Sequence, residues 1–203
     1  MLSKIKNNIK QNIKDYLSLS LFFIGGIVFG IFIVNKLSNI QKEELVNNVN
    51  TFISGLKNNN SINYAKLFGY SIKSNLISFV VIIVVSLSLF GRIGSSAFIL
   101  YNGIKIGYTL SAFILANGKI NGMLQGSALI FINKIIYIPL LFFLIISSFK
   151  FYECIKEEKY DNKKVLIFQY FAIGISVVAG LLICSVFETF ICSNLFLYII
   201  HLQ

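Results

Sequence analysis

Five long stretches of this sequence are apolar and nearly free of charge, and no other feature constrains the fold as strongly. They cover residues 16–35, 74–91, 93–118, 120–149 and 165–188. The third is interrupted only by Lys105 and the fourth only by Lys134. A helix needs about 20 mostly apolar residues to cross the hydrocarbon layer of a membrane. The pattern therefore predicts an all-α integral membrane protein with about five transmembrane helices.

The low share of charged residues indicates that lipid surrounds much of this chain. Only 13% of the residues are charged, whereas about 25% is ordinary for a soluble domain. The formal net charge is +10, but the basic residues fall mostly between the neutral stretches. Proteins that bind nucleic acid place Lys and Arg on a water-exposed face instead. We therefore expect cationic loops at a lipid surface and no nucleic-acid partner.

The distribution of Lys and Arg predicts the orientation in the membrane. With the amino terminus in the cytoplasm, ten of these residues fall on the inner side and six on the outer side. The ten are also packed into less chain, and cytoplasmic loops carry an excess of basic residues. We predict a multipass protein of the cell membrane with a cytoplasmic amino terminus and an external carboxyl terminus.

The segments between the spans complete a single polytopic domain, because none reaches the usual size of about 50 residues for an independent domain. Residues 1–15 have the pattern of a basic amphipathic helix, either on the membrane surface or as the first turns of the first span. Residues 36–73 form an outer segment and residues 150–164 a cytoplasmic loop. The apolar tail, residues 189–203, is about half a span long. We expect it to lie at the interface, to re-enter, or to extend a tilted helix.

The outer segment has two amphipathic stripes separated by a run of turn-forming residues at 57–61. They predict two short interfacial helices that rest on the membrane or on a partner protein. The apolar residues that we expect to serve in docking are Ile40, Val46, Val49, Ile53, Ile62 and Phe68.

No pattern in the chain predicts catalysis, a metal site or a cofactor. His201 is the only histidine, so neither a Ser-His-Asp triad nor a multi-histidine metal site can be built. Cys154, Cys184 and Cys192 lack Cys-x-x-Cys spacing and are interpreted as free structural thiols. The glycines show no nucleotide-binding motif.

Three charged residues inside apolar stretches are candidates for a functional intramembrane site: Lys105, Lys134 and Glu188. Counted from the inner boundary, the two lysines lie about 20 and 24 Å up and Glu188 about 36 Å, near the outer interface. The lysines either face a polar interior, a partner or a water-filled space, or snorkel along a packed helix. Glu188 either shares in that site or is an ordinary interfacial carboxylate.

Three neighbouring residues bear on that site. Asn133 and Asn102 favour a polar helix face beside the lysines, because amides hydrogen-bond across helices. Pro139 is the only proline, and it removes a backbone donor within the fourth span. A direct pair between Glu188 and Lys134 would require a tilt or a kink.

Small residues spaced by four let helix backbones approach closely in lipid. The glycines with this spacing are Gly26 and Gly30, Gly103 and Gly107, and the run Gly118, Gly122 and Gly126. We infer tight helix packing in the membrane, with a homodimer as one form of it. Gly118 can also serve as a turn between two spans.

Residues 21–45, LFFIGGIVFGIFIVNKLSNIQKEEL, resemble the first span and following segment of the stage II sporulation protein M family. The match includes the Gly-x-x-x-Gly helix that ends in Ile33-Val34-Asn35, followed by Leu37-Ser38 and Gln41-Lys42-Glu43-Glu44-Leu45. The basic start, the glycine-rich third span and a glutamate near the end of the last span, Phe187-Glu188, are also similar.

This resemblance implies a sporulation protein on the mother-cell side of the septum. It implies a non-catalytic scaffold that localises two peptidoglycan-remodelling partners, stage II sporulation proteins D and P, for engulfment of the forespore. Two alternatives stay open: a permease-like subunit of a transporter driven by a separate ATPase, and a multipass protein with a purely structural role.

Overall fold

The computed structural model describes residues 12–58, 63–156 and 163–201, and within these ranges the regular structure is entirely helical. In chain order the elements are α2 (Ile13–Lys36), α3 (Asn39–Asn58), α4 (Tyr64–Ser86), α5 (Gly91–Asn117), α6 (Lys119–Lys156), α7 (Lys163–Val186), the π-helical η1 (Phe187–Cys192) and α8 (Ser193–His201). Residues 59–62 and 157–162 lie outside the described ranges, and with them most of the predicted basic helix of residues 1–15, part of the turn-forming run at 57–61 and part of the predicted loop at 150–164.

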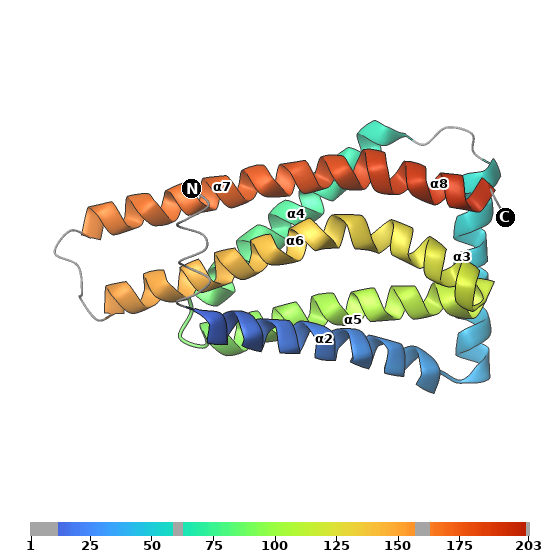
Figure 1. The fold of residues 1–203 in the computed structure, drawn as a ribbon, viewed down its shortest axis with the longest axis horizontal. Coiled ribbons are helices and arrows are strands. Elements are labelled where there is room, and N and C mark those ends of the chain that lie inside the picture. Colours follow the sequence, from blue (N-terminus) through green and yellow to red (C-terminus); the bar gives the residue numbers. More distant parts are fainter. Residues whose placement is uncertain (1–11, 59–62, 157–162, 202–203) are drawn as a thin grey trace.

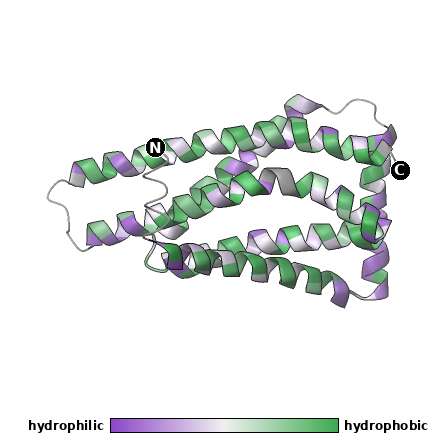
Figure 2. Cartoon of the chain, viewed as in Figure 1, coloured by the Kyte–Doolittle hydropathy of each residue, from purple (hydrophilic) through white to green (hydrophobic). Residues whose placement is uncertain are grey.

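Five helical segments among the described residues are long and apolar enough to cross a membrane. They are α2, α4, α5, the second half of α6, and the rod formed by α7, η1 and α8. Figure 2 shows apolar colour along most of their length and more polar colour toward the ends of the molecule. The prediction of an all-α integral membrane protein is confirmed.

The spanning helices run alternately back and forth along one long axis (Figure 1). Helix α3 lies across one end of this bundle, which we call the α3 end. The opposite end, called the Arg92 end, contains the turn between α4 and α5 and the start of α2. Because five crossings are an odd number, α8 finishes at the α3 end.

The second stripe of the outer segment is not a separate helix. It forms the first turns of α4, which continues without a break from Tyr64 to Ser86. Asn63 begins this helix, with its side chain accepting a hydrogen bond from the backbone N–H of Lys66. Residues 64–86 contain no proline that would break the helix. The helix therefore continues through Lys73, whose charge marks a change of polarity but not the end of a helix.

The apolar tail takes the third of the expected courses, because it extends the fifth span. Helix α8 follows η1 directly and carries the rod to His201. Its side chains Phe196 and Ile200 are buried with Val49 of α3 and Phe113 of α5. Packing against α3 and α5 therefore accounts for the apolar character of the tail.

Helix α6 is the centre of the bundle. Its second half contributes Tyr137, Leu141, Leu144 and Ile145 to the main core, and each is at most 2% exposed. These side chains meet buried residues of α2, α4, α5 and α7. Helix α6 arches near its middle (Figure 1). Pro139 lies inside this helix, where a proline supplies no backbone donor, and prolines are a common cause of helix kinks.

Glycines bring α2 and α5 into backbone contact. A Cβ atom added at Gly26 or Gly30 would overlap a carbonyl oxygen of α5, and one added at Gly103 or Gly107 would overlap a carbonyl oxygen of α2. Such close approach is how small residues join helices in lipid. The structure thus uses these four glycines inside one chain.

The third glycine run serves two different purposes. Gly118 has φ +79° and forms the turn between α5 and α6. A Cβ at Gly122 would overlap the backbone of Phe113, whereas one at Gly126 would lie 3.0 Å from a methyl group of Leu110. Gly122 and Gly126 therefore pack α6 against α5, and nothing in this geometry requires a second copy of the chain.

Candidate functional site

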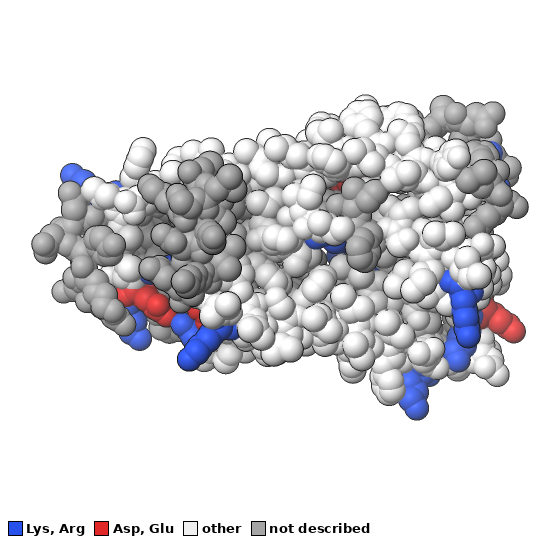
Figure 3. Space-filling view, in the orientation of Figure 1, with Lys and Arg blue, Asp and Glu red and all other residues white. Residues whose placement is uncertain are grey.

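Lys105, Lys134 and Glu188 lie at a similar level along the bundle, on α5, α6 and η1. Counted from the helix ends at the α3 end, they lie about 18, 22 and 20 Å deep. Figure 3 shows charged side chains at both ends of the molecule and a few basic and acidic atoms exposed between them. Glu188 is deeper than the sequence alone indicates, because the rod continues 13 residues beyond it to His201.

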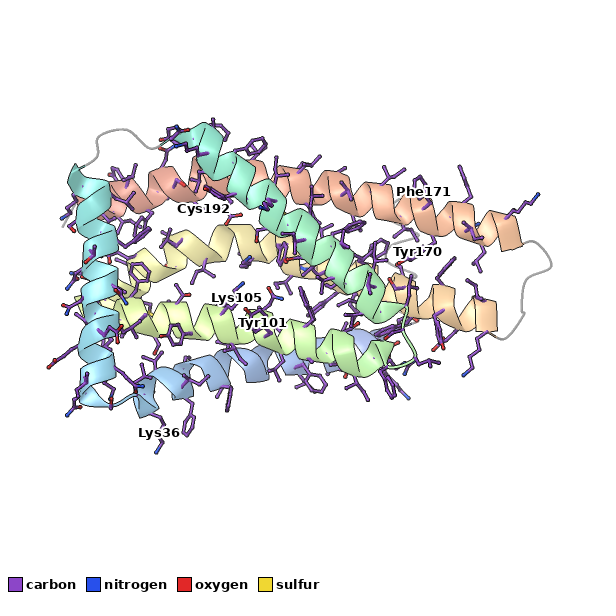
Figure 4. All side chains as sticks on the ribbon, turned by 180° about the vertical axis from the view of Figure 1, so that it is seen from behind. Lys36, Tyr101, Lys105, Tyr170, Phe171 and Cys192 are labelled. Atoms are coloured by element: carbon purple, nitrogen blue, oxygen red, sulfur yellow. The ribbon has the colours of Figure 1, made fainter. Side chains whose placement is uncertain are left out.

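Both lysines lie against tyrosine rings of their own helices. The Nζ atom of Lys105 is 5.2 Å from the ring centroid of Tyr101, and Nζ of Lys134 is 4.2 Å from that of Tyr137. Figure 4 shows Lys105 beside Tyr101 midway along α5, on the side toward α6. Each tyrosine lies about one turn nearer the Arg92 end, so both ammonium groups point away from the α3 end.

Glu188 is held by α4. Its Oε2 atom accepts a hydrogen bond of 2.6 Å from Oγ of Ser71. One turn deeper, Nδ2 of Asn75 donates to Oγ of Ser185 over 2.9 Å. We call these four residues the polar seam. Ser71, Asn75 and Ser185 are buried, so each side chain of the seam finds a partner on the facing helix.

The π-helical turn shapes this seam. Inside η1, Thr189 is buried and its hydroxyl donates to the backbone oxygen of Ser185 over 2.8 Å. Ser193 donates to the backbone oxygen of Glu188 over 3.3 Å, five residues back along the chain. Single π turns inside helices are frequent at functional sites. Here the turn directs Glu188 toward α4 and leaves the rod continuous.

The three charges interact without forming a close pair. Lys134 is within electrostatic range of both Glu188 and Lys105. Among the described side chains, no ion pair within 4.0 Å joins these three groups. A charge in the middle of a membrane costs about 2.5–3.5 kcal/mol on insertion scales. The formal charges of the three groups are two positive and one negative, so they do not cancel.

Sequence reasoning finds the three charges but misses three of their neighbours. Ser71 falls in what we predicted as the outer segment, and Asn75 and Ser185 fall in apolar stretches. The available signal is the spacing, because polar residues four apart at 71 and 75 share one helix face. Asn102 is buried, but its amide donates to the backbone oxygen of Phe98 on its own helix. The side chain of Asn133 lies outside the described part of the structure.

Helix α3 is fastened to the bundle by its apolar face. Val49 is 8% exposed and Ile53 packs beside it, against Phe113 and Phe196. These two predicted docking residues therefore face the bundle, because the end of the apolar core needs a cover. Phe68 is half-buried on α4, and Ile62 lies outside the described residues.

The opposite face of α3 is open. Ile40 is 79% exposed, and Glu43, Glu44 and Asn47 are exposed on the same side of the helix. We call these four residues the α3 surface. Beside it, Val46 and Leu115 help to line a hollow of about 310 Å³.

Arg92 organises the opposite end of the bundle. Its guanidinium donates to Glu153 over 2.9 Å and lies 3.9 Å from Asp15. It also lies 5.7 Å from the ring centroid of Phe149. Lys156, together with Arg92 and Glu153, lines a cavity of about 540 Å³ at this end. Arg92 thus ties α2 and α6 to the start of α5.

No group of three or more His, Cys, Asp or Glu side chains suited to hold a metal ion occurs in the described ranges. The sequence model of the family described as stage II sporulation protein M matches residues 19–193. The match includes most of all five spans, but it leaves out the first residues of α2 and all of α8 after Ser193. No curated protein and no solved structure matches the chain.

Proposed function

Because the chain belongs to the stage II sporulation protein M family, and is thus a sporulation-related membrane protein, we propose that it is a non-catalytic scaffold. It localises and anchors peptidoglycan-remodelling enzymes in the membrane of the sporulation septum, on the mother-cell side. Its partners are the stage II sporulation proteins D and P, and their joint action drives engulfment.

The observation that carries this proposal is the position of α3 across the end of the bundle (Figure 1). With the amino terminus in the cytoplasm, the α3 end lies outside the membrane, in the compartment where wall enzymes work. The buried contacts of Val49 with Phe113 and Phe196 hold α3 in place. A fixed helix is a better docking platform than a flexible loop, because less conformational entropy is lost when a partner binds.

The α3 surface has the properties of a docking site. Ile40 offers an exposed apolar side chain, and Glu43, Glu44 and Asn47 offer polar groups around it. An apolar anchor surrounded by polar residues is typical of protein interfaces. None of these four side chains contributes to the buried core, so they can be changed without unfolding the bundle.

The test is co-purification of proteins D and P with variants of the full chain from sporulating cells. Ile40→Ser combined with Asn47→Lys should reach the septal membrane normally and recover much less of both enzymes. Tyr70→Ser is the matched control, because Tyr70 is 71% exposed on α4 but lies outside α3. Unchanged recovery with the double variant would contradict docking on α3.

A second test removes the gene and stains the membranes of a sporulating culture. Arrest with a flat or bulging septum supports the scaffold role, whereas normal engulfment rejects it. Deleting residues 39–66 is a cruder test, because it also removes the cover of the core between Phe113 and Phe196.

The excess of one formal positive charge among Lys105, Lys134 and Glu188 favours one other function, a permease-like subunit for an anionic solute. In that case the 150–164 loop would couple to a separate ATPase. A co-purifying ATPase together with solute flux in vesicles would establish this alternative, and their absence with recovery of D and P would exclude it.

A further inference from the structure

Of the two intramembrane lysines, Lys105 is the exposed one, and among the described side chains no carboxylate lies within 4.0 Å of its ammonium group. Glu188 accepts a hydrogen bond from Ser71 and interacts with Lys134, whereas Lys105 is an exposed residue of α5. Its ammonium contacts the Tyr101 ring, but a ring carries no net charge to balance it. An exposed cation at this depth would face lipid unless something outside the chain covers it.

Snorkelling does not remove the problem. Lys105 is 12 residues from one end of α5 and 14 from the other, so it lies about 20 Å from either end. Its side chain is directed toward Tyr101 and therefore away from the nearer, α3 end. The ammonium group consequently stays near the middle of a hydrocarbon layer about 30 Å thick.

The surface around Lys105 is shaped to receive a helix. Ile93, Ala97, Tyr101 and Lys105 recur every four residues along α5, and all four are exposed. Side chains with this spacing form a ridge, the feature that packs into the groove of a neighbouring helix. We call these four residues the α5 ridge. Ala97 is small and allows close approach between helices in lipid.

Charge complementarity selects the occupant. Lipid phosphates lie at the interface, about 15 Å from the midplane, and would not reach Lys105. A second copy of this chain would offer Glu188, which is already bonded to Ser71. A partner helix with an Asp or Glu at mid-depth supplies a carboxylate at the right level.

We propose that the α5 ridge binds the membrane-spanning helix of a partner protein through an intramembrane carboxylate paired with Lys105. The ammonium of Lys105 donates to this carboxylate, and the hydroxyl of Tyr101, a residue 55% exposed, is placed to donate beside it. The biological meaning of this contact rests on the scaffold role. It adds an anchor inside the membrane to the docking surface on α3.

The test uses the full chain in phosphatidylcholine vesicles and two labelled probe peptides. Each probe is a leucine-rich spanning helix, with a single Glu at its centre in one and Gln in the other. Energy transfer to the labelled protein measures binding. We expect the Glu probe to bind at least about tenfold more tightly, as one charge-assisted hydrogen bond implies.

Variants assign the preference to one residue. Lys105→Met should abolish the preference for Glu, Lys105→Arg should retain it, and Tyr101→Phe should weaken it. Lys57→Met is the matched control, because Lys57 is an exposed lysine on α3. Equal binding of the two probes, or a preference that survives Lys105→Met, would overturn the proposal.

Two further arms identify other occupants. If phosphatidylglycerol in the vesicles removes the preference, a lipid phosphate occupies the site and the proposal is wrong. If an unlabelled second copy of this chain displaces the Glu probe, the occupant is a homodimer and the proposal is again wrong. Because the probes replace natural partners, failure here leaves the co-purification test of α3 unaffected.

Discussion

The contact between α2 and α5 allows a sharp test, because two adjacent glycines have opposite surroundings. A Cβ added at Gly26 would overlap the carbonyl oxygen of Leu100, whereas one added at Gly25 would meet nothing within 4 Å. The oxygen belongs to the backbone and cannot rotate away, so Gly26→Ala must push the two helices apart. Gly25→Ala is the matched control, with the same chemical change one residue away.

The expected magnitude follows from overpacking, which costs about 1–3 kcal/mol in a well-packed core. Replacing Gly by Ala in a helix returns up to about 1 kcal/mol of intrinsic propensity, and both variants share this gain. Gly26→Ala should therefore be less stable than Gly25→Ala by about 1–3 kcal/mol. For a chain of this size the difference in Tm is on the order of 5 °C.

The chain carries a suitable reporter for this measurement. Cys184 and Cys192 are buried thiols, so a thiol-reactive dye reports their exposure during heating. Cys154 is partly exposed and provides the constant background. Equal Tm values for the two alanine variants would refute the close contact of α2 with α5.

Three other predictions concern orientation and the two ends of the bundle. A membrane-impermeant maleimide added to intact cells should label an Asn47→Cys variant and spare Cys154; labelling of Cys154 alone would reverse the predicted orientation. Val49→Asp should release α3 and speed its cleavage by trypsin, whereas Asn48→Asp, a change at an exposed neighbour, should not; equal cleavage rates would show that the Val49 contacts do not hold α3. Arg92→Ala should lower the free energy of unfolding by less than about 1 kcal/mol, because the Arg92 side chain is 65% exposed and surface ion pairs contribute little. A much larger loss of Tm would show that the contacts of Arg92 with Asp15 and Glu153 are essential to the fold.

The number and type of spans could be predicted from the sequence. A charge-free stretch of this length has few ways to satisfy its backbone in lipid other than as a helix. Composition alone therefore decided the all-α class, and the resemblance of residues 21–45 indicated the family that the match over residues 19–193 then showed. The ends of the helices could be predicted less well. A charged residue marks a change of polarity along the chain, but a helix can continue through it. Helix α4 passes through Lys73, and the last rod passes through Glu188.

The depths of the charged residues and the partners of the small and polar residues were decided by the tertiary structure. The depth of a residue depends on how far its helix continues beyond it. Because α8 carries the rod on to His201, the structure places Glu188 deeper than the sequence-based estimate does. The pairing of Ser71 with Glu188 joins residues 117 apart in the chain, and only the packing of α4 against η1 brings them together. The sequence could place two lysines within the membrane and a glutamate near its outer interface. Only the packed helices show which of the two lysines is exposed, because exposure depends on how the elements pack against one another.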